Sequence, residues 1–61
     1  MLTSEASEFD VVKLKDGREG TVVEVHRVPG LPLAYEIEFD DGEFETVKPE
    51  EIERITWKAK H

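Results

Sequence analysis

A strand followed by a tight turn can be read in Leu33-Ala34-Tyr35-Glu36-Ile37-Glu38-Phe39-Asp40-Asp41-Gly42, the stretch of the chain that decides the fold. Its apolar residues Tyr35, Ile37 and Phe39 alternate with glutamates, so one face of the strand is apolar and the other is charged. The closing Asp-Gly dipeptide favours a hairpin, because glycine accepts the positive φ that such turns need. We therefore expect a β-hairpin with one face packed on a core.

The same alternation of short apolar runs and turn signals extends in both directions. Further strands are expected at 9–14, 20–28, 43–47 and 52–55, with a helical turn at 48–51, where a proline fits the first turn. Closing five short strands on themselves removes unpaired edges. The sequence thus predicts an all-β fold, a small five-stranded SH3-like barrel with one short helical turn before the last strand.

The expected domain spans residues 9–55, between a disordered tail at 1–8 and a C-terminal tail at 56–61. Gly20 is a natural position for a bulge. A bulge would decide whether Val11 or Val12, and whether Val22 or Val23, faces inward. The apolar positions of the strands predict a core of Val11 or Val12, Leu14, Val22, Val23, Val25, Tyr35, Ile37, Phe39, Phe44, Val47, Ile52 and Ile55.

Composition excludes several classes of protein. The 61 residues suffice for one domain, and the absence of cysteine excludes disulfides, thiolate metal sites and cysteine nucleophiles. No apolar run approaches the roughly 20 residues of a membrane helix. The first eight residues lack the basic and apolar parts of a secretory signal. We expect a cytoplasmic protein.

Acidic residues dominate the second half of the chain. The formal net charge is −7, from 15 Asp and Glu against eight Lys and Arg. Such a surface repels phosphate backbones, because nucleic-acid affinity comes largely from Lys and Arg. We expect four glutamates, Glu36, Glu38, Glu43 and Glu45, to lie side by side across the hairpin as a docking face for a basic protein; the alternative is a surface that only keeps the domain soluble.

Two apolar features offer other anchors for a partner protein. Leu31 and Leu33 lie in the proline-bounded segment at 29–33, where a stiff loop loses little entropy on binding. The alternative role for either leucine is to cap one end of the barrel. Trp57 follows the expected last strand, and tryptophan is enriched in binding hot spots, although it could also fold back over the open end.

Nucleic-acid binding would depend on Lys13, Lys15 and Arg18, which cluster around the first turn, with Phe9 as a nearby aromatic residue. We expect no such binding beyond non-specific affinity. Catalysis is not expected either, because no nucleophile, base and orienting group can be assembled, and a filled barrel leaves no pocket for paired carboxylates. No metal site or cofactor is predicted.

Three runs together resemble a known family. Asp10-Val11-Val12-Lys13-Leu14, Gly20-Thr21-Val22-Val23-Glu24-Val25 and Tyr35-Glu36-Ile37-Glu38-Phe39, followed by Asp41-Gly42, are similar to the small bacterial proteins of the domain of unknown function 4926, over roughly residues 9–55. The second run also resembles the strand core of KOW-type and other SH3-like barrels. The resemblance implies a fold, and brings no activity, cofactor or site residue.

The sequence therefore predicts a small non-catalytic protein-interaction module, a monomer or weak dimer. One alternative is an acidic neutraliser of a basic protein, of the immunity or antitoxin kind, whose charge would speed association. The other alternative is a KOW-like element that contacts RNA or the ribosome through Lys13, Lys15 and Arg18.

Overall fold

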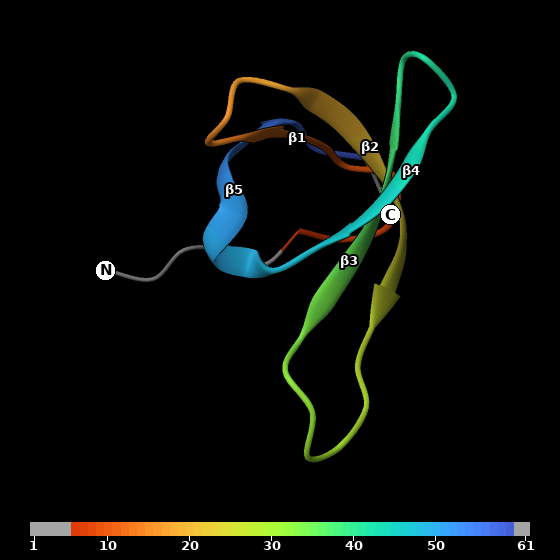
Figure 1. The fold of residues 1–61 in the computed structure, drawn as a ribbon, viewed down its shortest axis with the longest axis vertical. Helices are drawn as coiled ribbons and strands as arrows, with labels where there is room; N and C mark the ends of the chain where they lie inside the picture. The colour runs from red at the N-terminus through yellow and green to blue at the C-terminus, as the bar shows by residue number, and fades with distance from the viewer. Residues whose placement is uncertain (1–5, 60–61) are drawn as a thin grey trace.

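The computed structural model describes residues 6–59, so most of the expected N-terminal tail and the last two residues lie outside the described part. The described residues form five strands and one short 3₁₀ turn before the last strand (Figure 1). These elements are β1 (Val11–Leu14), β2 (Glu19–His26), β3 (Ala34–Phe39), β4 (Phe44–Val47), η1 (Pro49–Glu51) and β5 (Ile52–Trp57).

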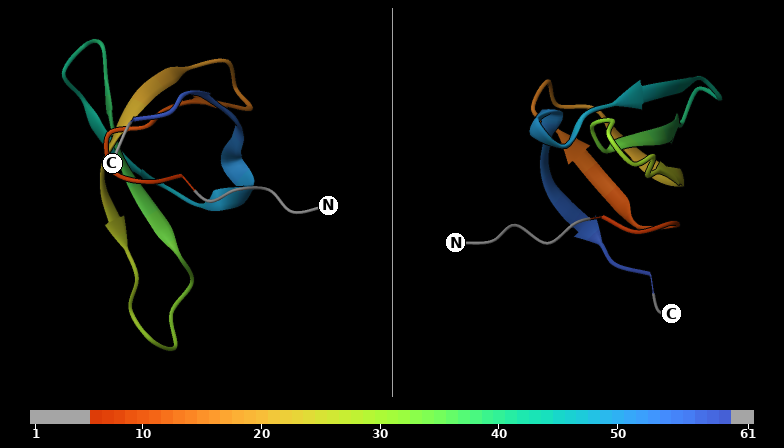
Figure 2. Two further views of the ribbon diagram at one scale, coloured as in Figure 1. Left: turned by 180° about the vertical axis from the view of Figure 1, so that it is seen from behind. Right: turned by 90° about the horizontal axis from the view of Figure 1, so that it is seen from below.

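All five strands belong to one antiparallel sheet in the order β4-β3-β2-β1-β5. This confirms the expected all-β class and the helical turn before the last strand. The sheet curls strongly (Figure 2), but the strand pairing leaves β4 and β5 as its two edges. The complete closure expected from the sequence is therefore not made by strand pairing.

The β3–β4 hairpin has a three-residue turn. The N–H of Phe39 donates to the carbonyl of Glu43, and the N–H of Gly42 donates to the carbonyl of Phe39, both at 2.9 Å. Gly42 has a φ of 85°, which confirms the positive φ expected of it. The turn puts Phe44 opposite Glu38, on the outer face, where its side chain is 55% exposed. The prediction that Phe44 lies in the core is wrong.

The core contains eight buried apolar residues: Ala6, Val12, Leu14, Val22, Tyr35, Ile37, Phe39 and Val47. Val25, Leu33, Ile52 and Ile55 pack against it from partly buried positions. A register shift in β2 lies between Val22 and Glu24, so Val22 faces the core and Val23 is only half-buried. The expectation of a buried Val23 is wrong, because the bulge falls inside the strand rather than at Gly20.

Both ends of the folded region extend further than the sequence predicted. Ala6 was assigned to the disordered tail, yet it is buried against the core. Thr56 and Trp57 were assigned to the C-terminal tail, yet they belong to β5, and Trp57 pairs with Val11. The buried carboxylate of Asp10 accepts hydrogen bonds from the backbone N–H of Ser7, before β1, and from that of Ala59, after β5.

Candidate functional site

A groove of about 1050 Å³ runs along strand β5. Every residue from 52 to 58 lines it, together with residues from other parts of the chain that include Ala6, Leu33 and Tyr35. Side chains of a strand alternate between its two faces, so a pocket above one face would be lined by every second residue. A groove lined by consecutive residues is one that meets the strand at its edge, which is where β5 ends the sheet.

The floor of the groove is apolar and its rim is charged. Leu33, Ile52 and Ile55 are partly buried against the core, and Tyr35 is fully buried beside them. These positions were expected in the core or at its end, and the partly buried Leu33, Ile52 and Ile55 supply the apolar part of the lining. The rim carries three cations and two carboxylates, from Lys15, Arg54, Lys58, Glu50 and Glu53.

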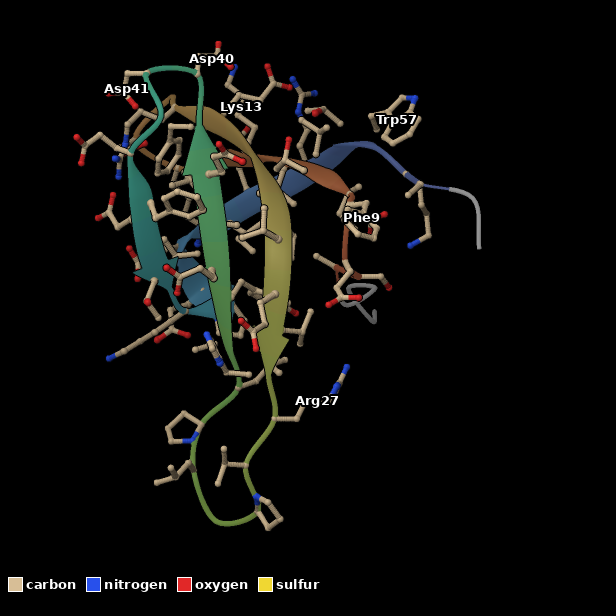
Figure 3. All side chains as sticks on the ribbon, turned by 90° about the vertical axis from the view of Figure 1, so that its right-hand side faces the viewer. Phe9, Lys13, Arg27, Asp40, Asp41 and Trp57 are labelled. Carbon is tan, nitrogen blue, oxygen red and sulfur yellow. The ribbon has the colours of Figure 1, made fainter. Side chains whose placement is uncertain are left out.

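Two of the predicted anchors line this groove. Leu33 lies on its floor and Trp57 at its lining, with the indole side chain 59% exposed. Leu33 thus packs against the core, as the capping alternative for this residue required. Figure 3 shows Trp57 on the same side of the molecule as Phe9, an exposed residue with a φ of 75°.

The other predicted leucine lies elsewhere. Leu31 is 64% exposed on the β2–β3 loop, which extends away from the sheet at the bottom of Figure 1. The N–H of Leu31 donates to the carbonyl of Val28 at 2.9 Å, and Gly30 has a φ of 84°. With Pro29 before the glycine, this matches a type II turn. Leu31 and Leu33 do not form one surface.

The four glutamates of the expected acidic face are divided between two sides of the sheet. In the β3–β4 register, Glu36 lies opposite Thr46 and Glu38 opposite Phe44, whereas Glu45 lies opposite Ile37. Glu43 precedes β4 and accepts a hydrogen bond from the N–H of Phe39, and Phe39 shares the face of Ile37, so Glu43 lies on the side of Glu45. The expectation that these residues lie side by side is wrong, because the three-residue turn shifts the pairing by one position.

On the outer face, the carboxylate of Glu36 lies close to Thr46 and His26. Its Oε1 accepts a hydrogen bond from the Thr46 hydroxyl at 2.9 Å and lies 3.5 Å from His26 Nε2. Glu36 also lies opposite Glu24 of β2, so two like charges face one another across this pair of strands.

The three cations predicted around the first turn have different contacts. Arg18 donates to Asp16 Oδ2 at 2.8 Å and to Glu45 Oε1 at 2.7 Å, and its guanidinium lies 4.6 Å from the centroid of the Phe39 ring. The hydrogen bonds to Glu45 and Asp16 raise the pKa of Arg18. Lys13 lies half-buried on β1, and Lys15 lies on the rim of the groove. The side chains of Lys13, Lys15 and Arg18 therefore have different neighbours.

The rim cations Arg54 and Lys58 were not singled out from the sequence. The sequence gave no reason to join them to Lys15, some 40 positions earlier. Among residues 6–59, no group of three or more His, Asp or Glu side chains is placed to hold a metal ion, and no helix of that part is long and apolar enough to cross a membrane.

Comparisons with protein-family models, with curated proteins and with solved structures find no match to this chain. The resemblance noted from the sequence stays a prediction. The function is therefore argued from the residues and their arrangement.

Proposed function

We propose that this chain is a small non-catalytic module that binds another protein in the groove along β5. The observation that carries the proposal is that Trp57, Leu33 and the partly buried isoleucines line one groove beside an edge strand. The cytoplasmic location expected from the sequence is part of the same proposal.

Three physical features support a protein as the ligand. An accessible apolar surface rimmed by charged side chains is typical of protein interaction sites. Tryptophan is among the residues that contribute most binding energy when a partner covers them, and Trp57 is more than half exposed in the free domain. The groove also lies beside a strand edge, whose backbone groups offer hydrogen bonds to a peptide chain.

Affinity capture with a matched pair of variants tests this proposal. Trp57→Ala removes an exposed aromatic side chain at the groove, and Phe44→Ala removes one on the opposite edge strand, β4, at nearly equal exposure. We expect a protein that the wild type and Phe44→Ala retain and Trp57→Ala loses. Retention of the same partner by Trp57→Ala, or recovery of RNA in place of protein, would overturn the proposal.

A second candidate function, an acidic neutraliser of a basic protein, is favoured by one observation. Asp40, Asp41 and Glu43 are exposed around a shallow hollow of about 570 Å³ at the tip of the β3–β4 hairpin, and Figure 3 shows the two aspartates at that tip. This candidate predicts that Asp40→Lys combined with Asp41→Lys abolishes capture of the partner, whereas the groove proposal predicts no loss.

A further inference from the structure

We propose that the Asp10 carboxylate is a clasp, which makes the segment before β1 and the segment after β5 open and close as one unit and so controls access to the apolar surface that Ala6 covers. This device holds whatever the groove binds, so its tests need no partner. Four features of the described residues support it: the hydrogen bonds of Asp10, the position of the two segments, the backbone of Phe9 and the lining of the groove.

The two oxygens of one buried carboxylate hold the two segments. Asp10 Oδ2 accepts from the backbone N–H of Ser7, and Asp10 Oδ1 accepts from that of Ala59, each at 2.8 Å. The side chain of Asp10 is fully buried, and Lys58 Nζ lies 3.6 Å from Oδ2. If either segment leaves, water reaches the carboxylate and competes for the hydrogen bond to the other segment. Release of one segment therefore weakens the hold on the other.

The two segments lie outside the strands and bury little apolar surface. Ala6 and Ser7 precede β1, and Lys58 and Ala59 follow β5. Among the described residues, Ala6 is the only buried apolar residue that belongs to no strand, and the Lys58 side chain is 59% exposed. Regions with few buried apolar contacts open at a lower free energy than core strands. We therefore expect the clasp to open while the sheet stays folded.

The backbone at Phe9 opposes the closed clasp. The N–H of Asp10 donates to the carbonyl of Ser7 at 3.0 Å, and Phe9, the third residue of this turn, has a φ of 75°. This position of a type II turn favours glycine or asparagine, so a bulky residue there is strained. In the described part of the chain, Phe9 is the only non-glycine residue with a positive φ. The closed state thus carries a strain that opening releases.

Opening of the clasp changes the groove. Ala6 is 4% exposed in the core, and Leu33 packs against that core. The lining of the groove includes Ala6, Leu33, Tyr35 and Lys58. When the two segments leave, Ala6 and Lys58 no longer line the groove, and the apolar side chains that Ala6 covered become accessible. The clasp therefore sets how much apolar surface the groove presents.

Amide hydrogen exchange of the wild-type chain tests the shared opening. We expect the protection of the Ser7 and Ala59 amides to agree within about threefold, and to lie at least about tenfold below that of the best protected amides of β2 and β3. Clearly different protection of the two amides, or protection equal to that of the strands, would overturn the inference.

A matched pair of variants tests the coupling from one end. Ala59→Pro removes the N–H that donates to Asp10, whereas Ala59→Gly retains it. We expect the Ser7 amide to exchange roughly tenfold faster in Ala59→Pro than in Ala59→Gly, because hydrogen bonds to a charged group are among the stronger ones. Equal exchange of Ser7 in the two variants would show that the segments open independently, against the proposal.

The strain at Phe9 is tested with a second pair. Phe9→Asn introduces a residue that tolerates a positive φ, whereas Phe9→Ala removes the same ring and keeps the strain. The amides of Ser7 and Ala59 should exchange several-fold more slowly in Phe9→Asn than in Phe9→Ala. Equal exchange in both variants would overturn the opposing role of Phe9.

Thiol labelling measures access to the surface under the clasp, since the chain has no cysteine. Ala6→Cys places a thiol at the buried position before β1, and Val47→Cys places one at a buried position of β4. We expect Ala6→Cys to be labelled several-fold faster when combined with Ala59→Pro than with Ala59→Gly, and Val47→Cys to be labelled at the same rate in both. Equal labelling of Ala6→Cys in the two backgrounds would overturn the control of access by the clasp.

Discussion

The buried carboxylate of Asp10 accepts a hydrogen bond from the backbone N–H of Ala59, at 2.8 Å, across 49 positions of sequence. Its other oxygen accepts from the N–H of Ser7 at 2.8 Å and lies 3.6 Å from Lys58 Nζ. One side chain therefore ties the segment before β1 to the segment after β5. Both of these segments lie beside the groove, since Ala6 and Lys58 line it.

The first prediction concerns Asp10 and pH. Burial alone would raise the pKa of Asp10, but the hydrogen bonds from Ser7 and Ala59 and the charge of Lys58 outweigh it and lower the pKa below its ordinary 3.8. A carboxyl whose folded pKa is depressed stabilises the fold above its unfolded pKa, and that contribution is lost as pH falls through the folded value. We expect stability to decline below about pH 4.

Asp10→Asn isolates this contribution. The amide keeps one acceptor oxygen and places an NH₂ group where the carboxylate accepted a hydrogen bond, which should cost about 1–3 kcal/mol of unfolding free energy at pH 7. Urea titrations between pH 2.5 and 7 measure both effects, with exposed Asp40→Asn as the control. An Asp10→Asn variant with the stability and acid dependence of the wild type would contradict the assignment.

The second prediction distinguishes the two phenylalanines on either side of the β3–β4 turn. Phe39 is buried in the core, whereas Phe44 is more than half exposed on the outer face. Phe39→Ala should cost about 3–5 kcal/mol, enough to unfold a marginal domain of this size. Phe44→Ala should cost less than about 1 kcal/mol, because it removes little buried surface. Chemical denaturation measures both, and comparable losses would refute the register of the hairpin.

Phe44 also shows which feature of the hairpin the sequence does not determine, namely the length of its turn. The sequence predicted that Phe39 and Phe44 are both buried, which would require a two-residue turn at Asp41-Gly42 that pairs them. The actual turn contains one more residue, pairs Phe39 with Glu43, and moves every later side chain of β4 to the other face. Asp-Gly is compatible with both turns, so the local sequence could not choose between them.

The groove was partly foreseeable. Leu33 was a candidate anchor because it lies in a proline-bounded segment, and Trp57 was one because tryptophan is enriched in binding hot spots. Their position in one groove depends on β5 extending to Trp57 and on Ala6 packing against the core. Both depend on contacts between distant parts of the chain, which periodicity within a single strand does not reveal.

The third prediction concerns the space at Gly20. A Cβ added there would lie 2.5 Å from Ile37 Cγ2 and 2.8 Å from the backbone oxygen of Glu38. The backbone atom cannot yield without disturbing the β2–β3 ladder, so Gly20→Ala should destabilise the domain by about 1–3 kcal/mol or more. Alanine favours a strand more than glycine does, so a loss of stability would report the close contact itself. Thermal unfolding tests this, and a Gly20→Ala variant as stable as the wild type would show that the strands pack less closely.

The fourth prediction separates the two sides of the acidic hairpin. Glu45 pairs with Arg18 at 2.7 Å, and Arg18 in turn covers the ring of Phe39, whereas Glu38 lies exposed opposite Phe44 on the other face. Glu45→Lys replaces an attraction by a repulsion and should lower the melting temperature by about 2–5 °C, a modest effect because the pair is solvent-exposed. Glu38→Lys makes the same change in net charge away from Arg18 and should have a smaller effect. Salt at about 1 M should reduce the difference by screening exposed charges. If Glu38→Lys proves the more damaging, the ion pair between Glu45 and Arg18 does not stabilise the hairpin.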